Sequence, residues 1–238
     1  MKAIELYEEI RNFCKANADE AKVKKYLRYF KEGYDSYGLS KEKFEEKVAS
    51  ILSDKKVNLK LVLNTSKHLL KSGKYEETSF AIFLFKGFSE QFTAETFKEV
   101  GKWFEIGIVN WAHADFVGGD VVSEFFERNI ITLKGLSDWR TAKNKYQRRA
   151  VPVAMITLLK KSSDYAPLFA FIEPLMLDSE RFVQQGLGWF LREAWKIKRK
   201  QTEAFLLKWK NEAPRVIYQY ATEKMTKEEK QRFKREKK

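Results

Sequence analysis

Residues 40–74 read SKEKFEEKVASILSDKKVNLKLVLNTSKHLLKSGK, and this stretch decides the fold class. Its apolar side chains recur every three or four residues, which is the period of a helix with one buried face. Ser40 stands at the N-cap position of a helix over 41–53. Gly73 follows a second helical pattern over 59–70 as a C-terminal cap. The stretch therefore predicts two helices joined by a short polar break.

The same pattern continues along the chain, for example at Leu6, Ile10 and Cys14, and in 94–106 behind the N-cap Thr93. Strand alternation and hairpin turn signals are missing. Helix pairs that repeat about every 40 residues predict an all-α, HEAT-like helical-repeat solenoid. Periodicity alone also fits a compact bundle. We expect a single domain over 1–225, followed by a basic C-terminal tail over 226–238.

The composition restricts the possible chemistry. With 238 residues and 44% hydrophobic residues the chain can bury a sizeable core. The single cysteine, Cys14, excludes an internal disulfide and a cysteine-based zinc site. Only His68 and His113 are available for a histidine metal site or a catalytic triad, so neither is expected. No secretory signal and no membrane-spanning run is recognisable, and a cytoplasmic location is expected.

The charge balance favours polyanionic partners. The formal net charge is +13, and residues 196–238 hold 15 Lys/Arg against 6 Asp/Glu. A basic surface attracts nucleic acid before other polyanions. A basic end that only keeps the protein dissolved fits the charge equally well.

Asn110, Trp111 and Asp115 share one predicted helix start in the sequence NWAHAD. Trp111 and Asp115 then lie on one helix face, where a carboxylate and an indole together can receive a cationic group. A half-buried tryptophan beside a structural ion pair is the other interpretation. His113 points away from that face and is expected to be structural. Gly118–Gly119, farther along the same stretch, are expected to kink the helix or admit another backbone.

A second segment, RTAKNKYQRR over 140–149, holds five cations and leads into the apolar run 150–159. We expect a helix here with Pro152 near its first turn, where proline is tolerated. Cations at a helix start oppose the helix dipole, and a bound anion would relieve this. Backbone amides with Arg148 and Arg149 would make a phosphate site. A solvated basic loop is the alternative.

A third segment, QQGLGWFLRE over 184–193, places two glycines inside a helical pattern. Each costs about 1 kcal/mol relative to alanine within a helix, so a packing or access reason is expected. Gly186 and Gly188 either clear space beside Trp189 or allow tight helix packing with Trp189 in the core.

Together the three segments resemble the AlkD-like family of DNA alkylation repair proteins, the HEAT-like alkylpurine DNA glycosylases. The resemblance covers about 23–220. Its matching pieces are Trp111 with Asp115, Arg-Arg-Ala at 148–150, Gly-Trp-Phe-Leu-Arg-Glu at 188–193, and the N-terminal Tyr-Leu-Arg-Tyr-Phe at 26–30.

The resemblance implies a solenoid whose concave, basic face grips the backbone of double-stranded DNA. It implies that Asp115 is the catalytic carboxylate and that Trp111 and Trp189 pack around the deoxyribose of the lesion. Arg149 would hold a phosphate. Further DNA contacts are expected from Arg148, Lys143, Lys145 and Arg192. The chemistry requires neither a metal nor an organic cofactor, the partner is duplex DNA with alkylated bases, and a monomer is expected.

The implied function is excision of positively charged N3- or N7-alkylated purines by a monofunctional DNA glycosylase. Such a base leaves as a neutral molecule, and a carboxylate stabilises the oxocarbenium-like sugar of the transition state. Two alternatives stay open: a non-catalytic binder of duplex or branched DNA that uses the same face, and a helical scaffold for protein partners.

Overall fold

The computed structural model describes residues 1–236, and every regular element within them is helical, which confirms the predicted all-α fold class. The chain divides into two compact units, Met1–His113 and Ala114–Lys238. The boundary falls inside helix α7 (Trp111–Phe116). Positions 237 and 238 of the predicted tail lie outside the described residues.

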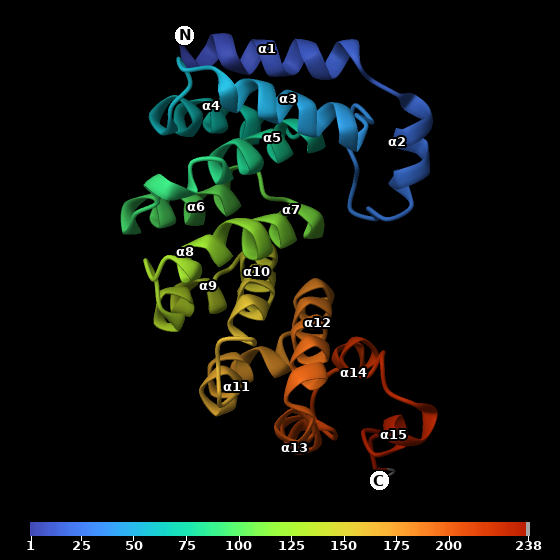
Figure 1. Ribbon diagram of the computed structural model, residues 1–238. Coiled ribbons are helices and arrows are strands. Elements are labelled where there is room, and N and C mark those ends of the chain that lie inside the picture. The colour runs from blue at the N-terminus through green and yellow to red at the C-terminus, as the bar shows by residue number, and fades with distance from the viewer. Residues whose placement is uncertain (237–238) are drawn as a thin grey trace. The chain divides into compact units, whose positions relative to one another are not determined.

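The first unit consists of helices joined by short links, apart from a longer segment over 28–40 (Figure 1). Its elements are α1 (Ala3–Ala16), α2 (Glu20–Leu27), α3 (Lys41–Ser53), α4 (Leu59–Lys71), α5 (Tyr75–Lys86), η1 (Ser89–Gln91) and α6 (Ala94–Ile106). Helix α5 is the centre of this unit, because it packs against α1, α3 and α4. Apolar side chains cover most of its circumference, and Phe80, Ile82 and Phe85 are fully buried.

The predicted caps form in this unit. The Ser40 hydroxyl accepts a hydrogen bond from the Lys43 amide at 3.3 Å, and the Thr93 hydroxyl accepts one from the Thr96 amide at 3.3 Å. Gly73 adopts φ +76° after α4, a left-handed conformation that suits glycine. Local capping chemistry therefore sets these helix ends, as the sequence predicts.

The second unit has more and shorter elements. They are η2 (Val117–Val122), α8 (Ser123–Glu127), η3 (Leu133–Leu136), α9 (Ser137–Arg140), α10 (Lys145–Met155), η4 (Ile156–Leu158), α11 (Ala166–Ile172), η5 (Glu173–Leu177), α12 (Arg181–Ile197), α13 (Arg199–Trp209), α14 (Arg215–Ala221) and α15 (Lys227–Gln231). Helix α12 is the centre of this unit, since it packs against α10, α13 and α14.

The predicted position of Pro152 near a first helical turn is wrong. Helix α10 begins at Lys145, because the Asn144 side chain accepts hydrogen bonds from the amides of Tyr146 and Gln147. Pro152 therefore lies inside the helix, where it lacks the amide that would bond the carbonyl of Arg148. Asn144 is an ordinary N-cap hidden within a run of cations.

The basic end of the chain folds onto the second unit. Thr226 caps α15 with its hydroxyl, which accepts from the Glu229 amide at 3.2 Å. Phe233 is 1% exposed, and its carbonyl accepts from Arg215 at 2.8 Å. Residues of the predicted tail thus contribute a buried aromatic ring, although most of the cations there stay exposed.

Candidate active site

Asp115 lies in α7 and forms an ion pair with Arg149 of α10. The helix begins behind Asn110, whose side chain accepts from the His113 amide at 2.9 Å, as predicted. Arg149 donates from Nε to one carboxylate oxygen of Asp115 at 2.8 Å and from Nη2 to the other at 2.8 Å. The pair is therefore bidentate, which is the strongest arrangement of these two groups.

This ion pair is mostly removed from water. The side chain of Asp115 is 15% exposed and that of Arg149 is 7% exposed. Burial raises the pKa of Asp115 above the ordinary value, while the Arg149 guanidinium opposes the shift by stabilising the carboxylate. Within residues 1–236, Arg149 supplies every hydrogen bond that the carboxylate accepts. A carboxylate has room for about four, so part of its acceptor capacity is unused.

Arg149 is the point at which the three predicted segments meet. Its Nη1 donates to the carbonyl of Phe182 at 2.7 Å, which ties the guanidinium to α12. Gly186 of α12 faces the side-chain stem, and a Cβ there would lie 3.0 Å from Cγ of Arg149. Because Gly186 has no side chain, the stem of Arg149 can cross α12 at this position. This close packing explains the glycine, for which the sequence left the reason open.

Trp189 follows one turn later in α12 and is half-buried. Gly188 allows α12 to pack closely against α14, since a Cβ there would lie 2.7 Å from the Ile217 carbonyl oxygen of α14. The Trp189 indole N–H has no acceptor among the described residues. Close helix packing and a partly accessible indole therefore occur side by side, rather than a tryptophan in the core.

Trp111, at the start of α7, is held within the first unit. Its ring stacks on Phe30, with centroids 5.4 Å apart and planes inclined by 15°. Its indole Nε1 donates to the Tyr29 carbonyl at 3.3 Å. Helical spacing places it one turn before Asp115. The contribution of Phe30 was not visible in the sequence, because the two aromatic residues are far apart along the chain.

Arg148 forms a second bidentate ion pair, with Asp178. The Nε–Oδ2 distance is 2.6 Å and the Nη2–Oδ1 distance is 3.2 Å. Nη1 donates to the carbonyls of Ala142 and Lys143 at 2.7 and 3.0 Å. The guanidinium therefore joins α10 to two loops. The sequence predicted a DNA contact for Arg148 and did not predict this structural role.

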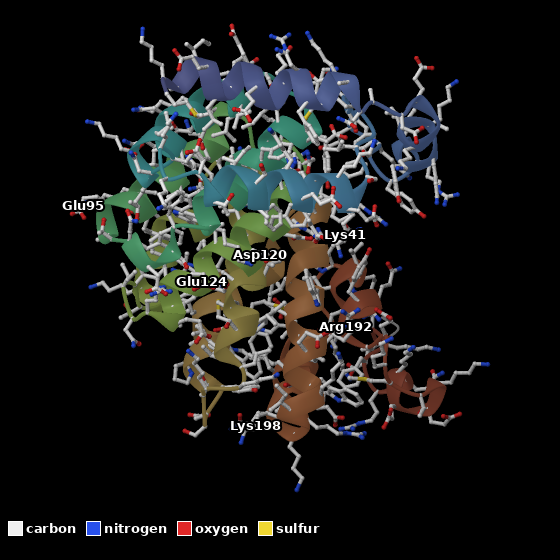
Figure 2. All side chains as sticks on the ribbon, turned by 45° about the horizontal axis from the view of Figure 1, so that its top comes forward. Lys41, Glu95, Asp120, Glu124, Arg192 and Lys198 are labelled. Atoms are coloured by element: carbon white, nitrogen blue, oxygen red, sulfur yellow. The ribbon has the colours of Figure 1, made fainter. Side chains whose placement is uncertain are left out.

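The other predicted DNA contacts have different surroundings. Lys143 is exposed, and its ammonium has no partner within residues 1–236. The ammonium of Lys145 lies over the Phe182 ring, 5.4 Å from its centroid. Arg192, which is labelled in Figure 2, pairs with Glu193 at 3.0 Å and with Glu223. Lys143 is thus the most available of the three cations.

The stretch after Asp115 is a π-helical segment, η2, that packs against α10. A Cβ at Gly118 would lie 2.7 Å from the carbonyl oxygen of Ala150, so only glycine allows this approach. The predicted close approach of another backbone is therefore confirmed. Single π-helical turns within α-helices are frequent at functional sites.

His113 has a structural setting. It is 1% exposed, and burial lowers its pKa to about 3. Its Nε2 lies 3.0 Å from the Tyr75 carbonyl oxygen, and its Nδ1 lies 2.8 Å from the side-chain amide nitrogen Nδ2 of Asn110. An imidazole with so low a pKa is neutral at physiological pH.

Within residues 1–236 no three side chains of His, Cys, Asp or Glu gather in a way that could hold a metal ion. No helix in that part of the chain combines the length and apolar character needed to cross a bilayer.

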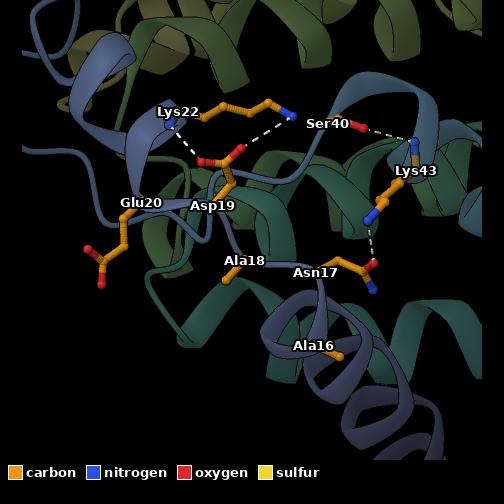
Figure 3. A pocket seen from close by; sticks show the side chains of 8 residues that line it. All are labelled: Ala16, Asn17, Ala18, Asp19, Glu20, Lys22, Ser40 and Lys43. Atoms are coloured by element: carbon orange, nitrogen blue, oxygen red, sulfur yellow. Dashed lines mark hydrogen bonds and ion pairs between the residues drawn. The ribbon is translucent and has the colours of Figure 1, made fainter.

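The first unit also has a polar pocket of about 440 Å³ between the start of α2 and the start of α3 (Figure 3). Its lining groups are largely paired: Lys43 bonds Asn17 at 2.8 Å, and Lys22 lies 3.8 Å from Asp19. None of the residues predicted from the sequence to act on DNA lines it.

Comparison with known proteins shows which family this chain matches. The family model described as DNA alkylation repair enzyme matches residues 10–225. Among solved structures, the chain is similar to a predicted DNA alkylation repair enzyme from Enterococcus faecalis, with a TM-score of 0.75 and 16% identity. That likeness covers 89% of this chain and 98% of the other, and at this identity it concerns the fold alone. No curated protein matches.

Proposed function

The chain belongs to the family of DNA alkylation repair enzymes, and on this premise we propose that it is a DNA glycosylase. Its substrates are N3- and N7-alkylated purines in duplex DNA, and their bases carry a positive charge. The observation that carries the proposal is the Asp115 carboxylate, buried next to Arg149 with acceptor capacity to spare. The predicted concave, basic DNA-binding face and the monomeric state are part of the same proposal.

The chemistry suits such a carboxylate. The C1′–N9 bond breaks with its electron pair on the base, which leaves as a neutral purine, and water adds to C1′ of the oxocarbenium-like sugar. A carboxylate in a poorly solvated site stabilises that developing positive charge and orients the water. The proton lost by the water passes to Asp115 or to solvent. No step requires a metal or an organic cofactor.

Arg149 and the two tryptophans have supporting roles in this proposal. A DNA phosphate competes with Asp115 for the guanidinium, so that binding of the backbone frees carboxylate oxygens for the sugar. The indoles of Trp111 and Trp189 offer flat, electron-rich faces to the cationic nucleoside. The alternative is a non-catalytic binder of duplex or branched DNA, which the engagement of both Asp115 oxygens by Arg149 favours.

Base release from methylated duplex DNA tests the proposal. The protein should release 7-methylguanine and 3-methyladenine, and Asp115→Asn should slow release by about 100-fold or more, because the stabilising charge is lost. The matched control is Asp178→Asn, which breaks the neighbouring bidentate pair with Arg148. Its folded fraction should release bases at the wild-type rate.

Circular dichroism and duplex binding show that each variant is folded. If Asp115→Asn retains its rate, or if both variants lose release equally, Asp115 is not the catalytic carboxylate. Salt-dependent duplex binding without release by the wild-type protein would favour the non-catalytic binder.

A further inference from the structure

The side chain of Trp111 is oriented by the segment 28–40 of the first unit. Two of its contacts restrict its orientation: the stack on Phe30 restricts the plane of the indole, and the hydrogen bond to the Tyr29 carbonyl restricts its rotation within that plane. Stacked rings attract one another beyond the effect of burial alone. Two consecutive residues of a non-helical segment thus restrict both side-chain torsions of Trp111.

Phe30 is itself held by other rings. It stacks on Tyr34, with centroids 4.5 Å apart and an interplanar angle of 12°. Tyr75, at the start of α5, meets Phe30 edge-on at 5.5 Å. The Tyr75 ring also stacks on His113 at 4.5 Å, two residues after Trp111. Phe30 is 9% exposed, so the stack rests on the body of the first unit rather than on a free loop.

A buried carboxylate anchors the far end of the segment. Glu76 is 5% exposed and accepts four hydrogen bonds from a single stretch of chain. The donors are the Ser36 hydroxyl and the amides of Tyr37, Gly38 and Leu39, at 2.6, 2.8, 2.8 and 3.0 Å. A carboxylate with this many donors is fully satisfied. It fixes the segment to α5, the central helix of the unit.

We infer that Phe30 is a positioning residue that presents the Trp111 indole at a fixed angle to the DNA lesion, on a segment that Glu76 anchors. The inference rests on the proposed function for the role of Trp111, but the orientation of the ring is a separate property. Misplacement of a catalytic contact by about 1 Å can cost on the order of 100-fold in rate. Loss of one stacking partner should cost less, about 10-fold.

The test is a double-mutant cycle between Phe30→Leu and Trp111→Ala, read as base release from methylated duplex DNA. Phe30→Leu should slow release about 10-fold in the otherwise wild-type protein, and Phe30→Tyr, which keeps the stack, should restore it. In the Trp111→Ala protein, Phe30→Leu should have no further effect. An equal loss in both backgrounds would overturn the inference, because Phe30 would then act independently of Trp111.

A spectroscopic measurement separates this inference from the proposed function. The near-ultraviolet circular dichroism of Trp111 is the difference between proteins with Trp111 and with Trp111→Phe. Phe30→Leu should abolish that difference signal, whereas Phe44→Leu, which alters a ring contact with Phe80 instead, should leave it intact. If Trp111→Ala releases bases normally, the proposed role of Trp111 fails, and this signal still decides the positioning. An unchanged signal in Phe30→Leu overturns the inference.

Discussion

Two neighbouring arginines of α10 form two bidentate ion pairs that differ in completeness. Arg148 and Asp178 are joined at 2.6 and 3.2 Å, and Asp178 also accepts from the Glu180 amide at 2.8 Å. Asp115 accepts from Arg149 alone among the described residues. The Asp178 carboxylate thus accepts three hydrogen bonds and the Asp115 carboxylate two, so that Asp115 keeps more unused acceptor capacity in a poorly solvated place.

The difference separates a structural ion pair from a candidate reactive one. A carboxylate with matched donors gains little from a new partner, because any newcomer must replace an existing hydrogen bond. Asp115 can gain, since burial disfavours its charge and few donors compensate for that. The same two residue types, one position apart on one helix, therefore serve different purposes.

The largest expected effect is on stability. Asp178→Asn should lower the free energy of unfolding by about 3 kcal/mol, because the partly buried Arg148 guanidinium loses its counter-charge and the Glu180 amide loses a charged acceptor. Asp115→Asn should cost less, about 1–2 kcal/mol, because burial already penalises the Asp115 charge. Urea unfolding of both variants measures this. Equal costs would mean that the two ion pairs are equivalent in their contribution to stability.

The next effect concerns the path of Arg149. Gly186→Ala places a Cβ 3.0 Å from Cγ of Arg149, so the guanidinium must shift against Asp115. Base release should fall about 10-fold, since orientation within the site is lost. Gly119→Ala is the matched control, because its Cβ would meet only Val153 Cγ1, at 3.7 Å. Release that is equally slow in both variants would point to a general effect of alanine rather than to Arg149.

A smaller effect is expected in the pH dependence. The pKa of Asp115 is raised from its ordinary value of 3.8, and catalysis requires the carboxylate. Enzyme-dependent release should therefore rise with pH through a limb that lies above 3.8. Arg149→Gln should move the limb to higher pH, because the guanidinium lowers this pKa.

The pH dependence of stability has the opposite sign to the pH dependence of base release. Between the unfolded and the raised folded pKa the folded state binds more protons, so the contribution of Asp115 to stability is lost as pH rises through the folded pKa.

Release whose pH profile is identical in wild type and Arg149→Gln would contradict the assignment of the limb to Asp115.

The smallest expected effect is on the salt dependence of duplex binding. Lys143 is exposed without a partner in 1–236, whereas Arg148 is engaged by Asp178. Lys143→Ala should reduce the slope of log K against log salt by about 0.9, the value for one phosphate contact. Arg148→Ala should leave the slope unchanged. Titrations at several salt concentrations decide between them, and an unchanged slope in Lys143→Ala would remove this residue from the DNA contacts.

Local features could be predicted from the sequence, because they depend on neighbours along the chain. Ser40, Thr93 and Asn110 cap helices as expected, since the cap bonds lie within three residues. The start of α10 was misplaced for the same local reason. Asn144 stands inside a run of cations that predicted a phosphate site, although its side chain caps the helix.

Partners far apart in the sequence could not be predicted. Asp178 lies 30 residues from Arg148, and nothing in either segment identifies the other. An ion pair at Asp115 was one of the two interpretations of the sequence, but the sequence did not identify Arg149 as the partner. The glycine at 186 signalled a close approach, but only the fold shows that the approaching group is the stem of Arg149.

The π-helical turn over Val117–Val122 has a consequence for how this protein tolerates insertions and deletions. Such a turn accommodates one residue more than a regular α-helix over the same rise. Removal of one residue there would restore ordinary α-helical winding within the turn, and the residues on either side would keep their phase. Asp115 and the buried face of α8 would then keep their present directions. Natural variants that have shortened this stretch by one residue should therefore retain the ion pair between Asp115 and Arg149.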